Sequence, residues 1–168
     1  MKKLLWVLMG LLLLVNIRVY SATLNFNNNG SLSALQASGT CGTWNNAWEY
    51  SNGEFSCNAQ VTFASGDLIR TTRTSVIIRG NGGIIVNNNS VGTASNRVNL
   101  TTTYGALEIS ASSNVFGNLQ TSSGAVTVQS SAVNGSIMSS GALTLNAASV
   151  SGSINSSGTG SISNGSTL

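Results

Sequence analysis

The chain has 168 residues, of which 7% are charged, and it contains two cysteines, no proline and no histidine. The absence of histidine excludes a Ser-His-Asp triad, an imidazole general base and a His-ligated metal site. Beyond residue 21, four arginines balance four carboxylates, so the formal net charge of +3 gives no electrostatic argument for binding nucleic acid.

Residues 1–21 have the pattern of a secretory signal peptide. Two lysines precede an apolar run from Leu4 to Val15, and Val19 and Ser21 occupy the −3 and −1 positions of a cleavage site after Ser21. The run is shorter than a membrane-spanning helix requires, although an uncleaved anchor is the alternative. We therefore predict export to the periplasm, the bacterial cell surface or the extracellular medium, with membrane contact only during export.

Residues 22–58 are predicted to form an N-terminal cap that is closed by a disulfide. Cys41 and Cys57 are the only cysteines, and an even pair in an exported chain indicates one disulfide bond. A loop of roughly 15 residues, closed in this way, is stabilised by about 3 kcal/mol in the chain-entropy model.

The same segment is rich in aromatic side chains, among them Trp44, Trp48 and Tyr50. In the first interpretation these rings pack into a cap over the first turn of the fold that follows. The alternative is a glycan-binding platform, because aromatic rings can stack on the faces of sugar rings.

The segment from 59 to 168 carries an internal repeat, and its fixed period of roughly 20 residues indicates stacked structural units. Apolar and small polar residues alternate within each motif, as in a half-buried strand. The first motif is GALEI at 105–109, GAVTV at 124–128 and GALTL at 141–145; the second is VFGNL at 115–119, VNGSI at 133–137 and VSGSI at 150–154.

The alternation separates an inward-facing set from an outward-facing set. The inward set is Leu107, Ile109, Val115, Leu119, Val126, Val128, Val133, Ile137, Leu143, Leu145, Val150 and Ile154. The outward set is Glu108, Thr127 and Thr144 on one strand and Asn118, Ser136 and Ser153 on the other. Two longer turns are expected upstream, with strands marked by Val61/Phe63, Leu68 and Val76/Ile78, then by Ile84/Val86, Val91 and Val98/Leu100.

These patterns predict an all-β fold, a right-handed parallel β-helix with the disulfide-closed cap at its N-terminal end. A sandwich gives no reason to keep one register over three units, and the strict hexapeptide period of a left-handed helix is absent. Gly117, Gly135 and Gly152 are expected to keep one corner of the coil tight. Because the repeat decays after Gly158, we expect the helix to be incomplete at its C-terminus.

The carboxylates do not form a pattern typical of an enzyme. A polysaccharide-degrading β-helix needs several acidic groups that converge on one groove, whereas Glu49 and Glu54 fall in the cap, Asp67 in a turn and Glu108 alone on a strand. A degenerate enzyme of that class would depend on Glu49, Glu54 or Asp67. We predict a protein without catalytic activity, metal or cofactor.

Several segments resemble the N-terminal region of MshQ-type proteins, which belong to the mannose-sensitive haemagglutinin (MSHA) type IV pilus system of Gram-negative bacteria. These segments are CNAQVTFASGD at 57–67, GIIVNNNSVG at 83–92, VNL at 98–100, and Tyr104-Gly105 at the start of the repeats. Most of residues 40–160 are covered by the resemblance.

The resemblance implies a surface or pilus-associated protein with a role in attachment or pilus biogenesis. Its expected partners are pilus or other cell-surface proteins, and glycans of a host or of the environment, but not nucleic acid. The leading hypothesis is a stalk or scaffold of an adhesin, and the alternative is a carbohydrate-binding module that uses Trp44, Trp48 and Tyr50.

Overall fold

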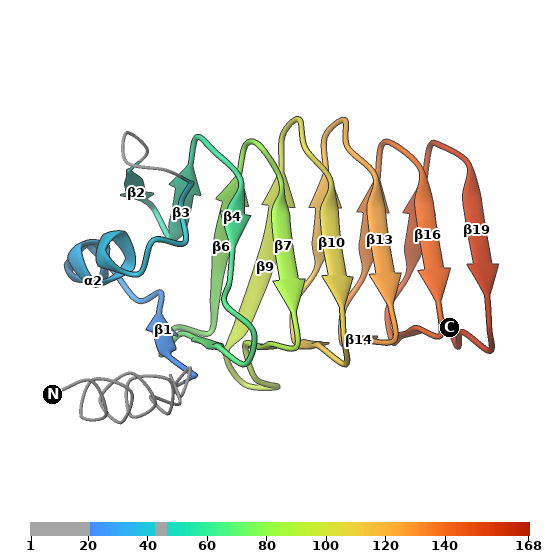
Figure 1. Ribbon diagram of the computed structural model, residues 1–168, viewed down its shortest axis with the longest axis horizontal. Coiled ribbons are helices and arrows are strands. Elements are labelled where there is room, and N and C mark those ends of the chain that lie inside the picture. Colours follow the sequence, from blue (N-terminus) through green and yellow to red (C-terminus); the bar gives the residue numbers. More distant parts are fainter. Residues whose placement is uncertain (1–20, 43–46) are drawn as a thin grey trace, which may run out of the picture.

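The computed structural model describes residues 21–42 and 47–168. In this part the chain winds into a parallel β-solenoid in which three sheets surround one apolar core (Figure 1). The strands of the front sheet point down, those behind point up, and the chain advances from left to right, so the winding is right-handed. The predicted fold class is therefore confirmed. None of the described helices has the length and apolar character that a membrane span requires.

Each turn contributes one strand to each sheet, in the order sheet I, sheet II, sheet III. Sheet I contains β4 (Val61–Thr62), β7 (Ile84–Asn87), β10 (Leu107–Ser110), β13 (Val126–Gln129), β16 (Leu143–Asn146) and β19 (Gly160–Ser163). Sheet II contains β1 (Thr23–Asn25), β5 (Leu68–Arg70), β8 (Ser90–Val91), β11 (Asn114–Val115), β14 (Ala132–Val133) and β17 (Ser149–Val150). Sheet III contains β2 (Trp48–Ser51), β3 (Glu54–Cys57), β6 (Ser75–Gly80), β9 (Arg97–Thr102), β12 (Leu119–Thr121), β15 (Ile137–Ser139) and β18 (Ile154–Ser156).

The turns become shorter along the chain while the register is kept. In sheet I, Val61 pairs with Ile84, and Ile84 pairs with Leu107 at the same interval in the sequence. The interval is shorter between Leu107 and its partner Val126, and shorter again between Val126 and Leu143. Because equivalent residues lie directly over one another, the inward side chains form continuous aliphatic columns.

The core consists of these columns, and the predicted inward residues are buried, apart from the half-buried Ile154. The strand that Leu68 marks is present as β5. Its buried residue is Ile69, whereas Leu68 is 37% exposed. Neighbouring side chains of a strand point to opposite faces, so Ile69 is the inward residue of this strand.

The N-terminal residues close one end of the coil. β1 pairs with β5 and β3 pairs with β6, both in parallel, so each extends a sheet of the solenoid by one strand. Between them lie the short 3-10 helix η1 (Asn29–Ser31), the helix α2 (Leu32–Ala37) and the strand β2, which pairs with β3 in an antiparallel arrangement. An isolated bridge from Cys41 to Val61 continues sheet I beyond β4.

Candidate functional site

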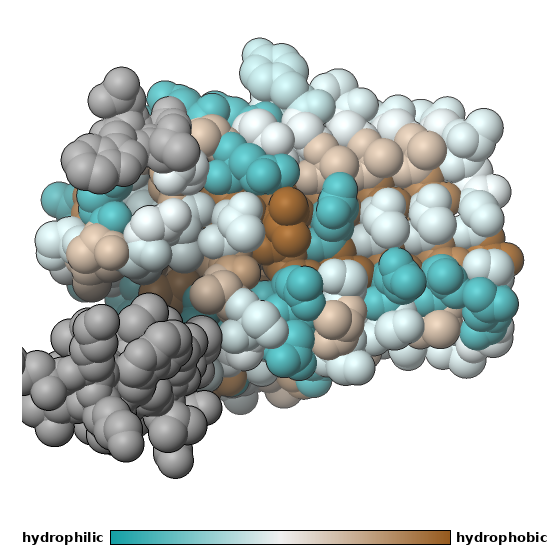
Figure 2. Space-filling model, viewed as in Figure 1, coloured by the Kyte–Doolittle hydropathy of each residue, from teal (hydrophilic) through white to brown (hydrophobic). Residues whose placement is uncertain are grey.

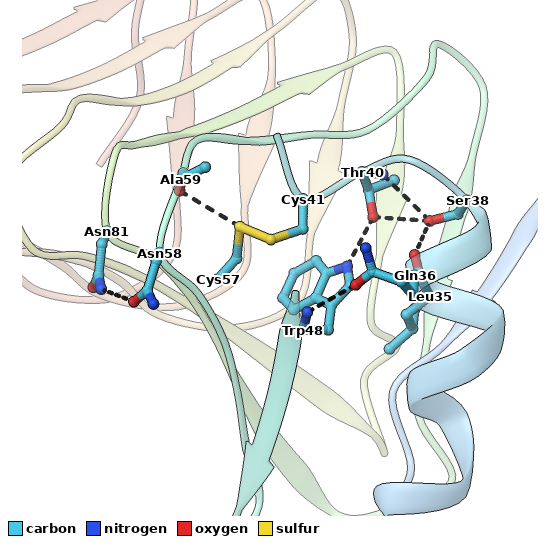
Figure 3. Close-up of a disulfide and its surroundings, with 10 residues drawn as sticks. All are labelled: Leu35, Gln36, Ser38, Thr40, Cys41, Trp48, Cys57, Asn58, Ala59 and Asn81. Carbon is cyan, nitrogen blue, oxygen red and sulfur yellow. Dashed lines mark hydrogen bonds between the residues drawn. A yellow bond between two sulfur atoms is a disulfide. The ribbon is translucent and has the colours of Figure 1, made fainter. Parts of the chain in front are cut away.

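The predicted disulfide is present and joins the segment before β2 to the end of β3. Cys41 and Cys57 are bonded, with their Cα atoms 5.7 Å apart (Figure 3). Cys57 ends β3, and Cys41 forms the bridge to Val61 of β4. The bond therefore ties together the N-terminal ends of sheets I and III.

Trp48 is a central packing residue of this end of the molecule. Its side chain is 4% exposed, and its ring lies edge-on to Phe26 with the centroids 5.4 Å apart. The indole Nε1 donates to Thr40 Oγ1 at 3.2 Å, and the backbone nitrogen donates to Gln36 Oε1 at 3.0 Å, as the dashed lines in Figure 3 show. Both faces of the ring are consequently withdrawn from solvent.

Tyr50 is half-buried on the neighbouring part of β2. Its ring packs on Phe55 at a centroid distance of 4.7 Å, and its hydroxyl accepts a hydrogen bond from Arg73 Nη1 at 3.1 Å. Trp44, the third residue of the predicted glycan platform, lies outside the described residues. The placement of Trp48 and Tyr50 favours the packing interpretation over the platform.

Glu54 and Arg79 form the one ion pair found in the described part of the chain. Arg79 Nε donates to Glu54 Oε1 at 2.6 Å, and Nη2 donates to Oε2 at 3.0 Å. These hydrogen bonds lower the pKa of Glu54 and raise the pKa of Arg79, while partial burial acts in the opposite direction on each. The pair joins β3 to β6 and thus fixes the cap strand to the first full turn.

The carboxylates do not converge. Glu49 and Glu54 lie on the paired strands β2 and β3 of sheet III, whereas Glu108 is exposed on sheet I and Asp67 is buried in the corner before β5. Within residues 21–42 and 47–168, there is no group of three or more His, Cys, Asp or Glu side chains that could hold a metal ion.

The corner between sheets II and III is built from stacked glycines. Gly117, Gly135 and Gly152 follow one another in successive turns, and a Cβ atom on Gly135 would overlap the carbonyl oxygen of Gly117. At Gly152 a Cβ atom would meet the backbone of Gly135 at 2.7 Å. A second glycine stack forms the corner between sheets III and I; its members are Gly82, Gly105, Gly124, Gly141 and Gly158.

The corner between sheets I and II contains a stack of mostly polar residues, all buried except the half-buried Ser166, which we call the corner column. Each member directly precedes a strand of sheet II or its continuation at Thr167. The members are Asp67, Asn89, Ser113, Ser131, Ala148 and Ser166.

Hydrogen bonds connect the corner column from turn to turn. The backbone nitrogen of Asn89 donates to Ser113 Oγ at 3.1 Å, that of Ser113 to Ser131 Oγ at 3.2 Å, and that of Ala148 to Ser166 Oγ at 3.1 Å. Sequence reasoning missed this column. Its signal is a small polar residue two positions before a buried valine, as at Asn89, Ser113 and Ser131.

A shallow groove of about 520 Å³ runs along the outside of this corner. Its lining includes Ser112, Ser130, Ala147 and Asn164, which have left-handed backbones with φ between 47° and 64°. Serine, alanine, asparagine, threonine and glycine line the groove without any charged side chain, so the groove has no group for acid–base chemistry.

Outward side chains also bond along the axis rather than toward a common point. The backbone nitrogen of Asn118 donates to Asn99 Oδ1 at 2.8 Å, that of Ser136 to Asn118 Oδ1 at 2.9 Å, and that of Ser153 to Ser136 Oγ at 3.2 Å. Figure 2 shows one face of the coil, where side chains of like hydropathy line up from turn to turn. The outward side chains thus form rows along the axis, some polar and some apolar, with few charges.

Comparison with known proteins finds no matching family model, no matching curated protein and no matching solved structure.

Proposed function

We propose that the chain is a non-enzymatic, exported β-solenoid that serves as the stalk or scaffold of a pilus-associated or cell-surface adhesin. The observation that carries this proposal is that polar groups of the coil form hydrogen bonds with neighbouring turns. Corner serines, outward asparagines and backbone amides hydrogen-bond to the next turn of the coil. These polar groups stabilise the stacking of turns into a rod and are not gathered around a binding pocket.

The physical properties of the coil suit such a role. Consecutive strands lie about 4.8 Å apart along the axis, and three parallel ladders with an in-register core resist local bending. The Cys41–Cys57 bond suits an oxidising compartment, where disulfides persist. The outer rows carry few charged groups that could bind a ligand. In this proposal, ligand binding therefore belongs to another surface that the rod carries.

The similarity to MshQ-type proteins supports a pilus as the place of action. In this role the coil contacts pilus subunits or other surface proteins, and the complete adhesin reaches glycans beyond them. Export and pilus association are both part of the proposal.

The experiment is immunodetection of the protein in a sheared pilus fraction from the native cells, beside the periplasm and the medium. Enrichment with sheared pili is expected, and a periplasmic enzyme followed in parallel reports leakage. A Gly135→Ala variant, in which the coil is disrupted, should be lost from the pilus fraction while its transcript level is unchanged. Confinement of the intact protein to the periplasm, or free release, would overturn the pilus role.

A glycan-binding assay with the purified protein tests the carbohydrate-binding alternative. A purified protein that binds glycans, and loses this binding in Tyr50→Ala while the coil stays folded, would replace the stalk with a binding module. Tyr50 is the suitable position because its ring is partly exposed.

A further inference from the structure

Ala22 meets the corner column at its N-terminal end. The backbone nitrogen of Ala22 donates to Asp67 Oδ1 at 2.9 Å, and Ala22 directly precedes β1, as the members of the column precede their strands. The bond repeats the pattern of the later turns, in which a backbone nitrogen donates to the side-chain oxygen of the next member. Ala22 is therefore the first level of the column.

Asp67 differs from the other acceptors of the column by its charge. The later acceptors are serine hydroxyls, whereas at this first level the acceptor is a carboxylate that is 4% exposed. Its second oxygen accepts from the backbone nitrogen of Ala64 at 3.1 Å. The ion pair between Glu54 and Arg79 is the one salt bridge in the described residues, so Asp67 has no side-chain cation there. A buried carboxylate without a cation is costly, and two neutral amides compensate for it only in part.

A cation becomes available if the chain is cut before Ala22. Ser21 and Ala22 are exposed, and the bond between them is the cleavage site that the N-terminal pattern predicts. Hydrolysis by a signal peptidase adds one water and breaks the C–N bond. Ser21 leaves as a carboxylate with the leader, and the nitrogen of Ala22 takes a proton and becomes an ammonium group.

We propose that the Ser21–Ala22 bond is a processing site, and that the new N-terminal ammonium group of Ala22 forms an ion pair with the buried carboxylate of Asp67. This ion pair holds β1 against the first turn of the coil. In the precursor the donor at this position is a neutral amide. In the processed chain the same atom carries a charge, so the hydrogen bond from a neutral amide to the carboxylate becomes an ion pair in which both partners are charged. β1, with its pairing to β5, is thus held most firmly after the leader has been removed.

This inference rests on the export in the proposed function but not on the stalk role. Its test uses the composition of the chain: the lysines are Lys2 and Lys3, so a chain that begins at Ala22 has a single amine, its α-amino group. The full-length chain is exported from a Gram-negative host and purified, and its N-terminus is determined by sequencing and intact mass. The rate of acetylation by an N-hydroxysuccinimide ester is then measured in native buffer and in urea.

We expect an N-terminus at Ala22 that reacts about tenfold more slowly in the folded protein than in urea, since a charge-assisted pair of ordinary strength withdraws the free amine to this extent. Asp67→Asn should remove most of the protection, and Glu108→Gln, at an exposed carboxylate on sheet I, should not change it. Acetylation should also lower the urea midpoint of the wild type but not that of Asp67→Asn.

If Asp67→Asn fails to fold, the wild-type midpoint before and after acetylation decides the question. Equal reaction rates in buffer and urea, or an unchanged midpoint after acetylation, would overturn the ion pair while leaving export intact. An N-terminus at another residue would overturn the processing site. Retention of Met1 would overturn the processing site and favour the uncleaved anchor, whereas absence from pili concerns the stalk role alone.

Discussion

At the scale of single residues, the Glu54–Arg79 pair is expected to make stability depend on acid. The pKa of Glu54 is lowered by its hydrogen bonds to Arg79, so the pair stabilises the fold above the unfolded pKa of about 4.3. This contribution is lost as the pH falls through the lower folded pKa. Because both side chains are about one-third exposed, we expect Glu54→Gln to reduce stability by about 0.5–1 kcal/mol at pH 7.

Urea unfolding of wild type and Glu54→Gln at pH 7 and at pH 3 measures this effect. The difference between the two proteins should shrink at the lower pH, where the wild-type carboxylate begins to be protonated. Glu108→Gln is the matched control, because Glu108 is exposed and lies on a different sheet. A difference that grows on acidification would contradict the assignment.

Trp48 is the residue whose truncation should do most harm at the N-terminal end. Its ring is almost fully buried against Phe26 and hydrogen-bonded to Thr40. Trp48→Ala should cost about 3–5 kcal/mol in the free energy of unfolding, and Tyr50→Ala, at a half-exposed ring, should cost distinctly less. Chemical denaturation followed by circular dichroism gives both values. Equal, small losses would show that Trp48 is dispensable for packing.

At the scale of elements, the glycine stack between sheets II and III sets the approach of successive turns. A Cβ atom on Gly135 collides with the backbone of Gly117, whereas at Gly160 of β19 it meets no atom within 4 Å. We therefore expect Gly135→Ala to lose at least about 3 kcal/mol of stability through strain and displaced strands, and Gly160→Ala to remain within about 0.5 kcal/mol of wild type. Thermal unfolding of the two variants distinguishes them, and a Gly135→Ala protein with the wild-type midpoint would refute the close approach.

The strands of the repeat could be predicted from sequence because alternation and period act together. A residue such as Val126 or Val133 is apolar, has a set place in its glycine-containing motif and recurs one turn later, so its inward direction is specified twice. In the upstream turns the period is less regular, so recurrence does not help to specify which residues point inward. At 68–69 the two adjacent aliphatic residues Leu68 and Ile69 predict a strand but not which of them is buried, and in the structure it is Ile69.

The N-terminal elements could not be predicted in the same way. Leu32–Ala37 forms a helix of six residues, which is too short for a periodic signal and depends on packing against the following strands. Trp48–Ser51 and Glu54–Cys57 form a hairpin in which one strand joins the solenoid. The role of Asp67 depends on contact with Ala22, 45 residues away, which no local pattern specifies.

At the scale of the whole molecule, the disulfide holds together the N-terminal ends of sheets I and III. The bond spans 16 positions between Cys41 and Cys57, and its loss should lower stability by about 3 kcal/mol if unfolded-chain entropy dominates. A Cys41→Ser/Cys57→Ser variant and the reduced wild type should show the same lowered urea midpoint. A reducing agent that lowers the midpoint of the serine variant as well would indicate an effect other than the bond.

Because the last turns keep a constant register, the length of the solenoid can change in steps of one turn. Val126 lies over Leu143, Val133 over Val150 and Ile137 over Ile154, and the interval in the sequence is the same for all three pairs. A gene duplication that repeats residues 126–142 would therefore add one more coil and lengthen the particle by about 4.8 Å. A duplication one codon shorter would turn the outward faces of the affected strands inward. Selection for a longer or shorter protein could in this way add or remove whole turns, because each added turn repeats the contacts that already exist between neighbouring turns.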